Sequence, residues 1–132
     1  MGNCIDYNLK KQTMESCEEL TFKGQKLKCK VIEVYDGDTV TLAFKFRGKY
    51  FKKRCRLHGI NSPEIRTRDR EEKKQGFLAK DHLKEMIDGK IIILDCFGWD
   101  KYGRLLGNIY MGKICINDKM MEDGFAEKYE LK

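Results

Sequence analysis

Apolar residues occupy every second position in two stretches of the chain, and this alternation restricts the fold more than any other feature. In residues 27–31 the apolar positions alternate with lysines, and a second alternating stretch covers residues 40–46. A period of two is typical of a strand with one buried face. The Arg-Gly-Lys segment at 47–49 is typical of a hairpin turn, and residues 50–60 return as a third strand. The pattern therefore predicts an antiparallel sheet.

The period changes after Pro63, the only proline of the chain. We expect an exposed polar loop to about Glu72, followed by a helix that ends at Gly89. The apolar face of this helix contains Ala79, Leu83, Met86 and Ile87.

Two further strands and a short helix complete the predicted elements. The strand at 91–97 is too continuously apolar for a sheet edge, and another strand follows at 105–111. The last helix is predicted to begin at Asn117 as N-cap and to end by Gly124. Five strands in the order β-β-β-α-β-β-α predict a mainly β fold with helices (α+β). We expect a five-stranded barrel, closed or partly open, with two or three helices packed against it.

The chain is long enough for one hydrophobic core. It has 132 residues, of which 41% are hydrophobic, and this favours a single domain. We assign residues 25–132 to that domain and residues 1–24 to a polar N-terminal arm. In the arm, Met14, Cys17 and Leu20 have the spacing of one short helix face. We expect a monomer.

The cysteines and the hydropathy favour an intracellular protein. The six cysteines include no C-x-x-C pair, so we expect free and mostly buried thiols. No hydrophobic run approaches the ~20 residues of a membrane span. The N-terminus lacks the apolar centre of a signal peptide.

The first residues offer an alternative location. Removal of Met1 would expose Gly2, an acceptor for myristate, beside Cys4, an acceptor for palmitate. Two acyl chains would anchor the protein stably at a membrane, whereas one would not. Asp6 argues against acylation, because the motif has Ser or Thr there. A membrane anchor and an ordinary N-terminus are therefore both retained as hypotheses.

The positive charge of the chain is concentrated in one region. The formal net charge is +6, but residues 45–74 alone contain twelve Lys and Arg against four acids, a net of +8. A local basic excess favours a polyanionic partner, because counterion release drives such binding. The alternative is a solvated lysine-rich surface.

Two carboxylates stand at turns next to predicted strands. Asp38 follows Asp36 and Gly37 and directly precedes an alternating strand, so its carboxylate projects from a rigid strand end. Glu64 follows Pro63, which restrains the backbone before it. Asp-Gly is also a common turn pair, and a loop glutamate is often only a surface charge.

Two arginines complete a possible phosphate site. Arg56 precedes a segment that enters the barrel and so lies at its mouth, and Arg104 ends the segment 100–104 after a glycine. Guanidinium groups bind phosphate bidentately. Metal-assisted phosphodiester hydrolysis requires such arginines, oxygen ligands for a hard cation and a free carboxylate for water. Here the cation ligands would be a carboxylate and an amide oxygen. The alternative for each arginine is a surface charge.

Three segments in this order and spacing resemble the staphylococcal nuclease (thermonuclease) family. Residues 36–40 read Asp-Gly-Asp-Thr-Val, residues 56–64 read Arg-Leu-His-Gly-Ile-Asn-Ser-Pro-Glu, and residues 100–104 read Asp-Lys-Tyr-Gly-Arg. The resemblance covers residues from about 26 to 129. It implies an OB-fold barrel and a calcium-dependent nuclease. In that reaction the metal polarises a phosphate, water attacks in line, and the products end in a 3′-phosphate.

The resemblance implies a metal site at three positions. Asp38 corresponds to the first ligand, Asn61 to the second carboxylate ligand, and the backbone carbonyl of Ser62 to the third. The family usually has aspartate where this chain has Asn61. An amide oxygen still ligates Ca²⁺, but the ligand set loses one formal charge. We therefore expect activity with weaker metal affinity.

The resemblance also implies catalytic and substrate-binding positions. Glu64 would orient or deprotonate the attacking water, while Arg56 and Arg104 would neutralise charge on the phosphoryl oxygens. The expected contacts with nucleic acid come from Lys101 and Tyr102 at a terminal phosphate and from Tyr129 as a stacking face.

The two histidines and the tryptophan say less about the function. His58 and His82 have no second metal-type neighbour, so structural roles are favoured. Trp99 either stacks on a base or covers the barrel rim.

Two functions are compatible with these residues. The first is a metal-dependent endonuclease acting on DNA, RNA or both with little sequence preference. The second is a non-catalytic or weakly active OB-fold module that binds nucleic acid. The presence of Glu64, Arg56 and Arg104 favours the enzyme, and only Asn61 favours the module.

Overall fold

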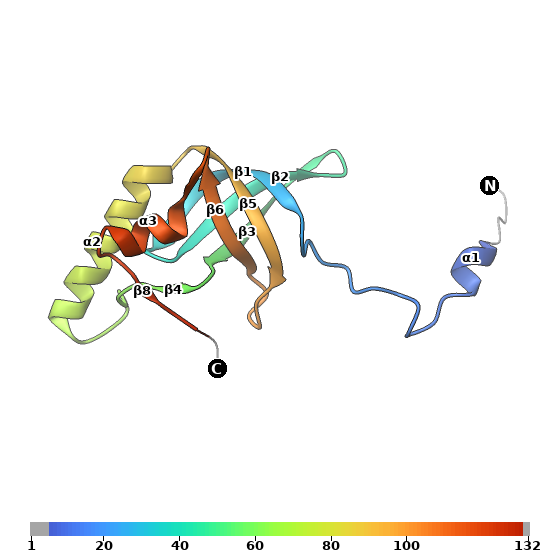
Figure 1. The fold of residues 1–132 in the computed structure, drawn as a ribbon, viewed down its shortest axis with the longest axis horizontal. Helices are drawn as coiled ribbons and strands as arrows, with labels where there is room; N and C mark the ends of the chain where they lie inside the picture. The colour runs from blue at the N-terminus through green and yellow to red at the C-terminus, as the bar shows by residue number, and fades with distance from the viewer. Residues whose placement is uncertain (1–5, 131–132) are drawn as a thin grey trace.

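Five strands form a small barrel through four antiparallel pairings and one parallel pairing (Figure 1). The computed structural model describes residues 6–130. The barrel strands are β1 (Lys26–Asp36), β2 (Thr39–Phe46), β3 (Lys49–Leu57), β5 (Ile91–Trp99) and β6 (Leu105–Met111). The sheet order is β3-β2-β1-β5-β6-β7, and a parallel pairing of β3 with β6 closes the barrel. The predicted α+β barrel of five strands is therefore confirmed.

The alternation in the sequence decides which side chains fill the barrel. In β2, Val40, Leu42 and Phe44 face the core while the residues between them face outward. β5 lies between β1 and β6, in agreement with the prediction that this strand is not at an edge. Each fully buried aliphatic side chain stabilises the fold by about 1.5–3 kcal/mol. Met121 and Phe125 pack against this core from the C-terminal side, as expected.

Helix α2 (Arg70–Ile87) covers one side of the barrel. It begins about three residues earlier than predicted, because the Asp69 side chain accepts hydrogen bonds from the backbone N–H groups of Glu71 and Glu72. Gly89 has a φ of +74°, and it ends the helix as predicted. The buried face of the helix consists of Gly76, Ala79, Leu83 and Ile87.

The last helix, α3 (Ile116–Glu122), starts differently from the prediction. Asn117 is not its N-cap: Cys115 occupies that position without a side-chain hydrogen bond. The Asn117 amide is buried and faces the barrel. It accepts the backbone N–H of Ile109 at 3.0 Å and donates to the carbonyl of His58 at 2.8 Å. A buried amide is stable only when its hydrogen bonds are made, and the barrel offers more partners than a helix end.

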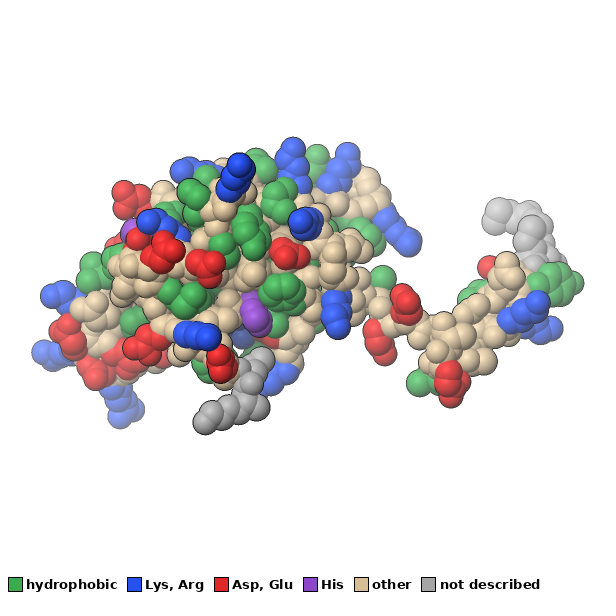
Figure 2. Space-filling view, viewed as in Figure 1, with side chains coloured by type: hydrophobic (Ala, Val, Ile, Leu, Met, Phe, Trp, Pro, Cys, Tyr) green, Lys and Arg blue, Asp and Glu red, His purple; other side chains and the backbone are tan. Residues whose placement is uncertain are grey.

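Three short strands add to the barrel. β4 (Ile60–Asn61) pairs with β8 (Glu127–Lys128), and β7 (Ile114–Cys115) pairs antiparallel with β6. In the face drawn in Figure 2, acidic side chains gather towards the α2 end among several Lys and Arg, and further Lys and Arg side chains lie at the β2–β3 end.

The N-terminal arm extends away from the barrel (Figure 1). Within residues 6–24, the only regular element is α1 (Tyr7–Lys10). The predicted helix face of Met14, Cys17 and Leu20 is wrong: these three residues are exposed and lie in a turn and an extended stretch. Without a surface to cover it, a short apolar face does not stabilise a helix.

The arm meets the barrel at Phe22. The Phe22 ring contacts Phe44, Phe46 and Trp99, with ring centroids 5.4 to 5.7 Å apart. Trp99 therefore covers the barrel rim, one of its two predicted roles. Gly2 and Cys4, the candidate acylation sites, lie outside the described residues. Within residues 6–130, no helix has both the length and the apolar character needed to cross a bilayer.

Candidate active site

The ends of three strands meet beside α2 and form the site. The registers pair Asp36 with Thr39 and Thr39 with Arg56, so the β1–β2 turn lies next to the end of β3. A backbone hydrogen bond from Leu57 to the carbonyl of Asp38, at 2.8 Å, holds the two segments together. Sequence positions 20 residues apart therefore become neighbours.

Asp38 is the centre of the hydrogen-bond network. It is only 7% exposed. Its Oδ2 accepts the backbone N–H and the hydroxyl of Ser62, at 3.0 and 3.2 Å, and its Oδ1 accepts the Thr39 hydroxyl at 3.0 Å. Arg56 Nη1 lies 3.5 Å from Oδ2. A buried carboxylate needs such partners, because an isolated buried charge is costly.

Arg56 links two of the predicted metal ligands. Its Nη1 donates to the carbonyl of Leu57 at 2.9 Å, which orients the guanidinium group. Its Nη2 lies 3.4 Å from Oδ1 of Asn61, and Nη1 faces Asp38. The structure therefore brings together Arg56, Asp38, Asn61 and Ser62, which are all sites predicted from the sequence.

Two glycines permit the close packing behind the site. A Cβ atom on Gly37 would lie 2.7 Å from Cβ of Ser62 and 2.8 Å from Cβ of Ala79. A Cβ atom on Gly76, in α2, would lie 2.9 Å from the carbonyl oxygen of Glu64. The helix thus presses directly on the segment that carries the site, and side chains at either glycine would separate them.

Asp36 is a site residue that the sequence analysis did not assign. Its Oδ1 accepts the backbone N–H of Asp38 at 3.0 Å. Burial, together with the nearby Asp38 carboxylate, raises the pKa of Asp36 to about 6. The two acids of the Asp36-Gly37-Asp38 motif were visible in the sequence, but only the fold shows that both carboxylates lie at the same place.

Glu64 lies in the same hollow as Asp36. Its backbone N–H points to Oε1 of Glu72 at 3.5 Å, and its side chain is exposed. The hollow measures about 480 Å³, and its lining includes Tyr35, Asp36, Glu64 and Arg66. The carboxylate is therefore accessible to water and to a substrate, as its predicted role requires.

Arg104 lies on the turn between β5 and β6, at a second hollow of about 500 Å³. Its Nε donates to Oδ2 of Asp100, and its backbone N–H donates to Oδ1 of Asp100 at 2.8 Å. Burial alone would raise the pKa of Asp100, but these bonds and the one from the Tyr102 N–H outweigh it, so the pKa is lowered. The guanidinium also lies 5.3 Å from the Tyr102 ring centroid.

The predicted substrate contacts are divided between two places. Lys101 and Tyr102 are exposed on the β5–β6 turn, with Nζ of Lys101 5.1 Å from the Tyr102 ring centroid. Tyr129 lies next to β4, where its N–H donates to the carbonyl of Gly59 at 2.8 Å. Among the described residues, no aromatic contact or hydrogen bond joins Tyr129 to Lys101 or Tyr102.

The histidines lie outside this constellation. His82 Nε2 lies 2.7 Å from Oδ2 of Asp123, and its ring stacks on Phe125 at 4.2 Å. His58 contacts the Phe97 ring edge-on at 4.9 Å. These contacts agree with structural roles.

The donor set at the site fits a hard cation. The side-chain oxygens of Asp38 and Asn61 lie together with Ser62, and the Asp36 carboxylate adds a second negative group nearby. Ca²⁺ prefers oxygen ligands of this kind. Burial is the main cause of the raised pKa of Asp36, and the nearby Asp38 carboxylate adds to it; a cation here would favour the ionised form. In residues 6–130 no cluster of three or more His, Cys, Asp or Glu side chains forms a complete site, so an amide and a carbonyl would have to contribute.

Comparison with known proteins supports the same interpretation. The family model described as staphylococcal nuclease homologue matches residues 54–132. An "Uncharacterized endonuclease" of Escherichia coli O157:H7 is 33% identical over 104 residues, which are 76% of this chain and 60% of that protein. "Staphylococcal-like nuclease CAN1" of Arabidopsis thaliana is 35% identical over 78 residues, 59% of this chain and 22% of that protein.

The chain spans about three fifths of the length of the Escherichia coli relative and a smaller part of the plant protein. The family match covers more than half of this chain and includes Arg56, Asn61, Glu64 and Arg104. The chain therefore belongs to the staphylococcal nuclease homologue family.

Proposed function

We propose that this protein is a metal-dependent endonuclease that hydrolyses phosphodiester bonds of DNA, RNA or both and leaves 3′-phosphates. One observation carries the proposal: Asp38, Arg56, Asn61 and Ser62 form one network, and Asp36, which accepts the backbone N–H of Asp38, lines the hollow that contains Glu64. These are the groups that phosphodiester hydrolysis requires, and the fold assembles them from separate segments. The names of the relatives agree with this activity.

A divalent cation, which we expect to be Ca²⁺, would be held by Asp38, Asn61 and the carbonyl of Ser62, and it would polarise the scissile phosphate. Asp36 would stabilise it by charge. The buried hydrogen bonds of Asp38 hold its carboxylate in a fixed direction. This preorganisation lowers the cost of arranging the site during the reaction.

The reaction assigns separate tasks to the carboxylate of Glu64 and the two arginines. Glu64 takes a proton from the water that attacks phosphorus, and the bond from phosphorus to the 5′ oxygen breaks. The leaving oxygen takes a proton from solvent. Arg56 and Arg104 bind the phosphoryl oxygens, where negative charge grows. Lys101 and Tyr102 bind a neighbouring phosphate, and Tyr129 offers a face for stacking.

Little sequence preference is expected from this site. Every residue proposed to bind the substrate is cationic or aromatic. Cationic groups bind phosphates and aromatic rings stack on base faces, and all nucleotides have both. Base edges would have to be read by side chains placed for hydrogen bonding in a groove, and the assigned residues do not include such a set.

Digestion of single- and double-stranded DNA and RNA tests the proposal. The protein should cleave with added Ca²⁺, should lose cleavage in a chelator, and should leave 3′-phosphate ends. Mg²⁺ provides a comparison for the identity of the metal. Binding without metal-dependent cleavage would instead identify a nucleic-acid-binding module.

The variant Glu64→Gln tests the role of the free carboxylate. Turnover should fall roughly 100-fold or more, within the range of general acid–base catalysis, while substrate affinity changes little. Glu85→Gln, at an exposed position of α2, is the control and should retain wild-type turnover. Wild-type turnover in Glu64→Gln would remove Glu64 from the mechanism.

A further inference from the structure

The active-site hollow and the second hollow are neighbours on the barrel surface. Ile32 and Glu33 of β1 line both of them. The second hollow is also lined by Thr41, Lys52 and Arg54 from the sheet and by Tyr102 and Arg104 from the β5–β6 turn. We call this second hollow the basic groove. Its lining includes Arg104, one of the proposed phosphate ligands, and does not include Glu64.

Basic residues follow one face of β3 towards this groove. Lys52, Arg54 and Arg56 are two residues apart, so their side chains project from the same face of the strand. Alternate residues of a strand are about 6.6–6.8 Å apart. This separation is comparable to that of successive phosphates in an extended polynucleotide strand. Arg56 is the end of the row that lies in the active site.

The neighbouring strand leaves space above this row. Thr41 is the register partner of Arg54, and Ala43 is the partner of Lys52. Both residues of β2 are small, so their side chains do not cover the long basic side chains beside them. The sheet therefore presents a shallow floor with cations along one edge and the β5–β6 turn above it.

Two basic side chains of the groove, those of Lys52 and Arg54, are available to a ligand, whereas Arg104 is paired with Asp100. Within residues 6–130, neither Lys52 nor Arg54 forms an ion pair. The Arg54 guanidinium lies 4.5 Å from the Tyr35 ring centroid. A guanidinium placed over a ring keeps its N–H groups free to bind phosphate, while the ring limits its motion.

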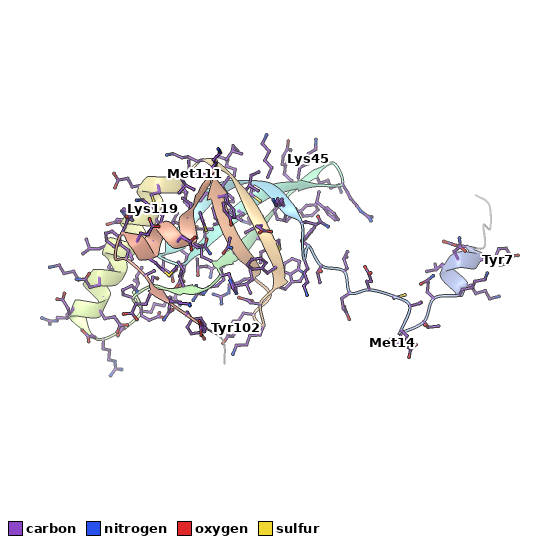
Figure 3. The ribbon with its side chains drawn as sticks, viewed as in Figure 1. Tyr7, Met14, Lys45, Tyr102, Met111 and Lys119 are labelled. Carbon is purple, nitrogen blue, oxygen red and sulfur yellow. The ribbon has the colours of Figure 1, made fainter. Side chains whose placement is uncertain are left out.

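Two exposed tyrosines lie along this path: Tyr50 continues the row on β3, and Tyr102 lines the groove. Tyr50, near the β2–β3 hairpin, is 77% exposed, and Tyr102 is 71% exposed. Lys45, the register partner of Tyr50, and Tyr102 lie at opposite edges of the barrel in Figure 3. Stacking on such rings requires bases that are not already stacked in a duplex, so the aromatic positions favour a single strand.

We propose that the basic groove and the outer row of β3 bind the single-stranded nucleic acid that flanks the scissile phosphate, with Lys52 and Arg54 on successive phosphates. The position of the scissile phosphate rests on the proposed nuclease function. From Arg56 to Tyr50 the row extends about 20 Å at about 3.4 Å per residue. Glu33 is the only acid in the lining of the groove, and it opposes binding there.

Fluorescence anisotropy of a labelled 15-residue oligothymidylate, measured in chelator, tests this proposal without any cleavage. Lys52→Gln/Arg54→Gln should lower the slope of log K against log salt by about 1.4, because each single-strand phosphate contact contributes about 0.7. This change in slope corresponds to binding by the variant that is about 25-fold weaker than wild type at 0.1 M salt. Because binding is measured directly, failure of the nuclease proposal would not affect this result.

A charge-matched variant provides the control. Lys49→Gln/Lys113→Gln also removes two positive charges, but Lys49 projects from the opposite face of β3 and Lys113 lies in the turn between β6 and β7. Neither residue lines the groove. This variant should keep the wild-type slope to within about 0.3, less than half of one contact. An equal loss in both double variants would overturn the proposal, because it would show only a net-charge effect.

Glu33→Gln gives a test of opposite sign. Removal of this acid should tighten binding roughly threefold, the Coulomb term for charges about 7 Å apart in water. Unchanged or weaker binding would contradict the proposed path.

A duplex of the same length that binds tighter than the single strand would also overturn the proposal. Binding to vesicles of phosphatidylserine and phosphatidylcholine provides a further test. The proposal would be overturned if the groove variant lost vesicle binding while it retained oligothymidylate binding.

Discussion

Asn61 is the residue at which this chain departs from the usual pattern of its family. Its Oδ1 lies 3.4 Å from Nη2 of Arg56, in the network that contains Asp38. Asn61→Asp should lower the metal concentration for half-maximal activity by roughly tenfold, since one formal charge returns to the ligand set. Titration of activity with Ca²⁺ measures this. An unchanged midpoint would show that position 61 is not a ligand.

Asp100 stabilises the turn that carries Arg104. Its folded-state pKa lies below the ordinary value of 3.8, so its contribution to stability is fully present above that value and is lost as the pH falls through the lower folded pKa. Asp100→Asn should cost about 1.5–3 kcal/mol at pH 7, the range for hydrogen bonds to a charged group. Urea unfolding at pH 7, 5 and 3 should show the difference from wild type narrowing only below about pH 4. A difference that is equal at all three pH values would contradict this account.

Helix α2 and the active-site segment depend on their close approach. Gly76→Ala would favour the helix by intrinsic propensity, roughly 1 kcal/mol, if the position were open. Its Cβ would meet the Glu64 carbonyl oxygen at 2.9 Å, however, and overpacking costs about 1–3 kcal/mol. We therefore expect a net loss of stability and lower turnover, because Glu64 is displaced.

The neighbouring position supplies the control for this prediction. Gln75→Ala, exposed on the same helix, should be neutral or slightly stabilising. Denaturant midpoints of both variants, measured together with turnover, separate the two effects. If Gly76→Ala were stabilised like an open helical position, the close contact would play no part in holding Glu64.

Phe22 joins the arm to the barrel through an aromatic cluster, beside a backbone hydrogen bond from Gly24 N–H to the carbonyl of Cys96 at 2.8 Å. Phe22 packs between Phe44, Phe46 and Trp99, whereas Leu20, two residues earlier, is exposed. Phe22→Ala should cost about 1–3 kcal/mol, less than a fully buried Phe because the ring is only partly covered. Leu20→Ala should change the unfolding free energy by less than about 0.5 kcal/mol. Equal effects in thermal or urea unfolding would show that the arm is held in another way.

Much of the fold could be predicted from local patterns. The period of two in β1 and β2 depends only on which face of a strand is buried, and Gly89 ends α2 because of its positive φ. The errors arose where distant partners decide the outcome. Asn117 leaves the N-cap position for hydrogen bonds with Ile109 and His58. Such partners are not neighbours in sequence.

The same distinction applies to the site. Asp38, Arg56, Asn61 and Ser62 were recognised by type and spacing, and the structure brings them within hydrogen-bond distance. The role of Asp36 and the row of Lys52 and Arg54 beside Arg104 were not recognised. Their significance depends on burial and on the register of neighbouring strands, which no local pattern contains.

The sequence by itself determined the barrel class, the family and the identity of the groups around Asp38, because these depend on residue type and on the spacing of short segments. Only the tertiary structure decided that Gly76 must be small, that Asp36 shares the site, and that one face of β3 leads from Arg56 into a groove. The physical reason is that packing, desolvation and strand register arise between segments distant in the chain.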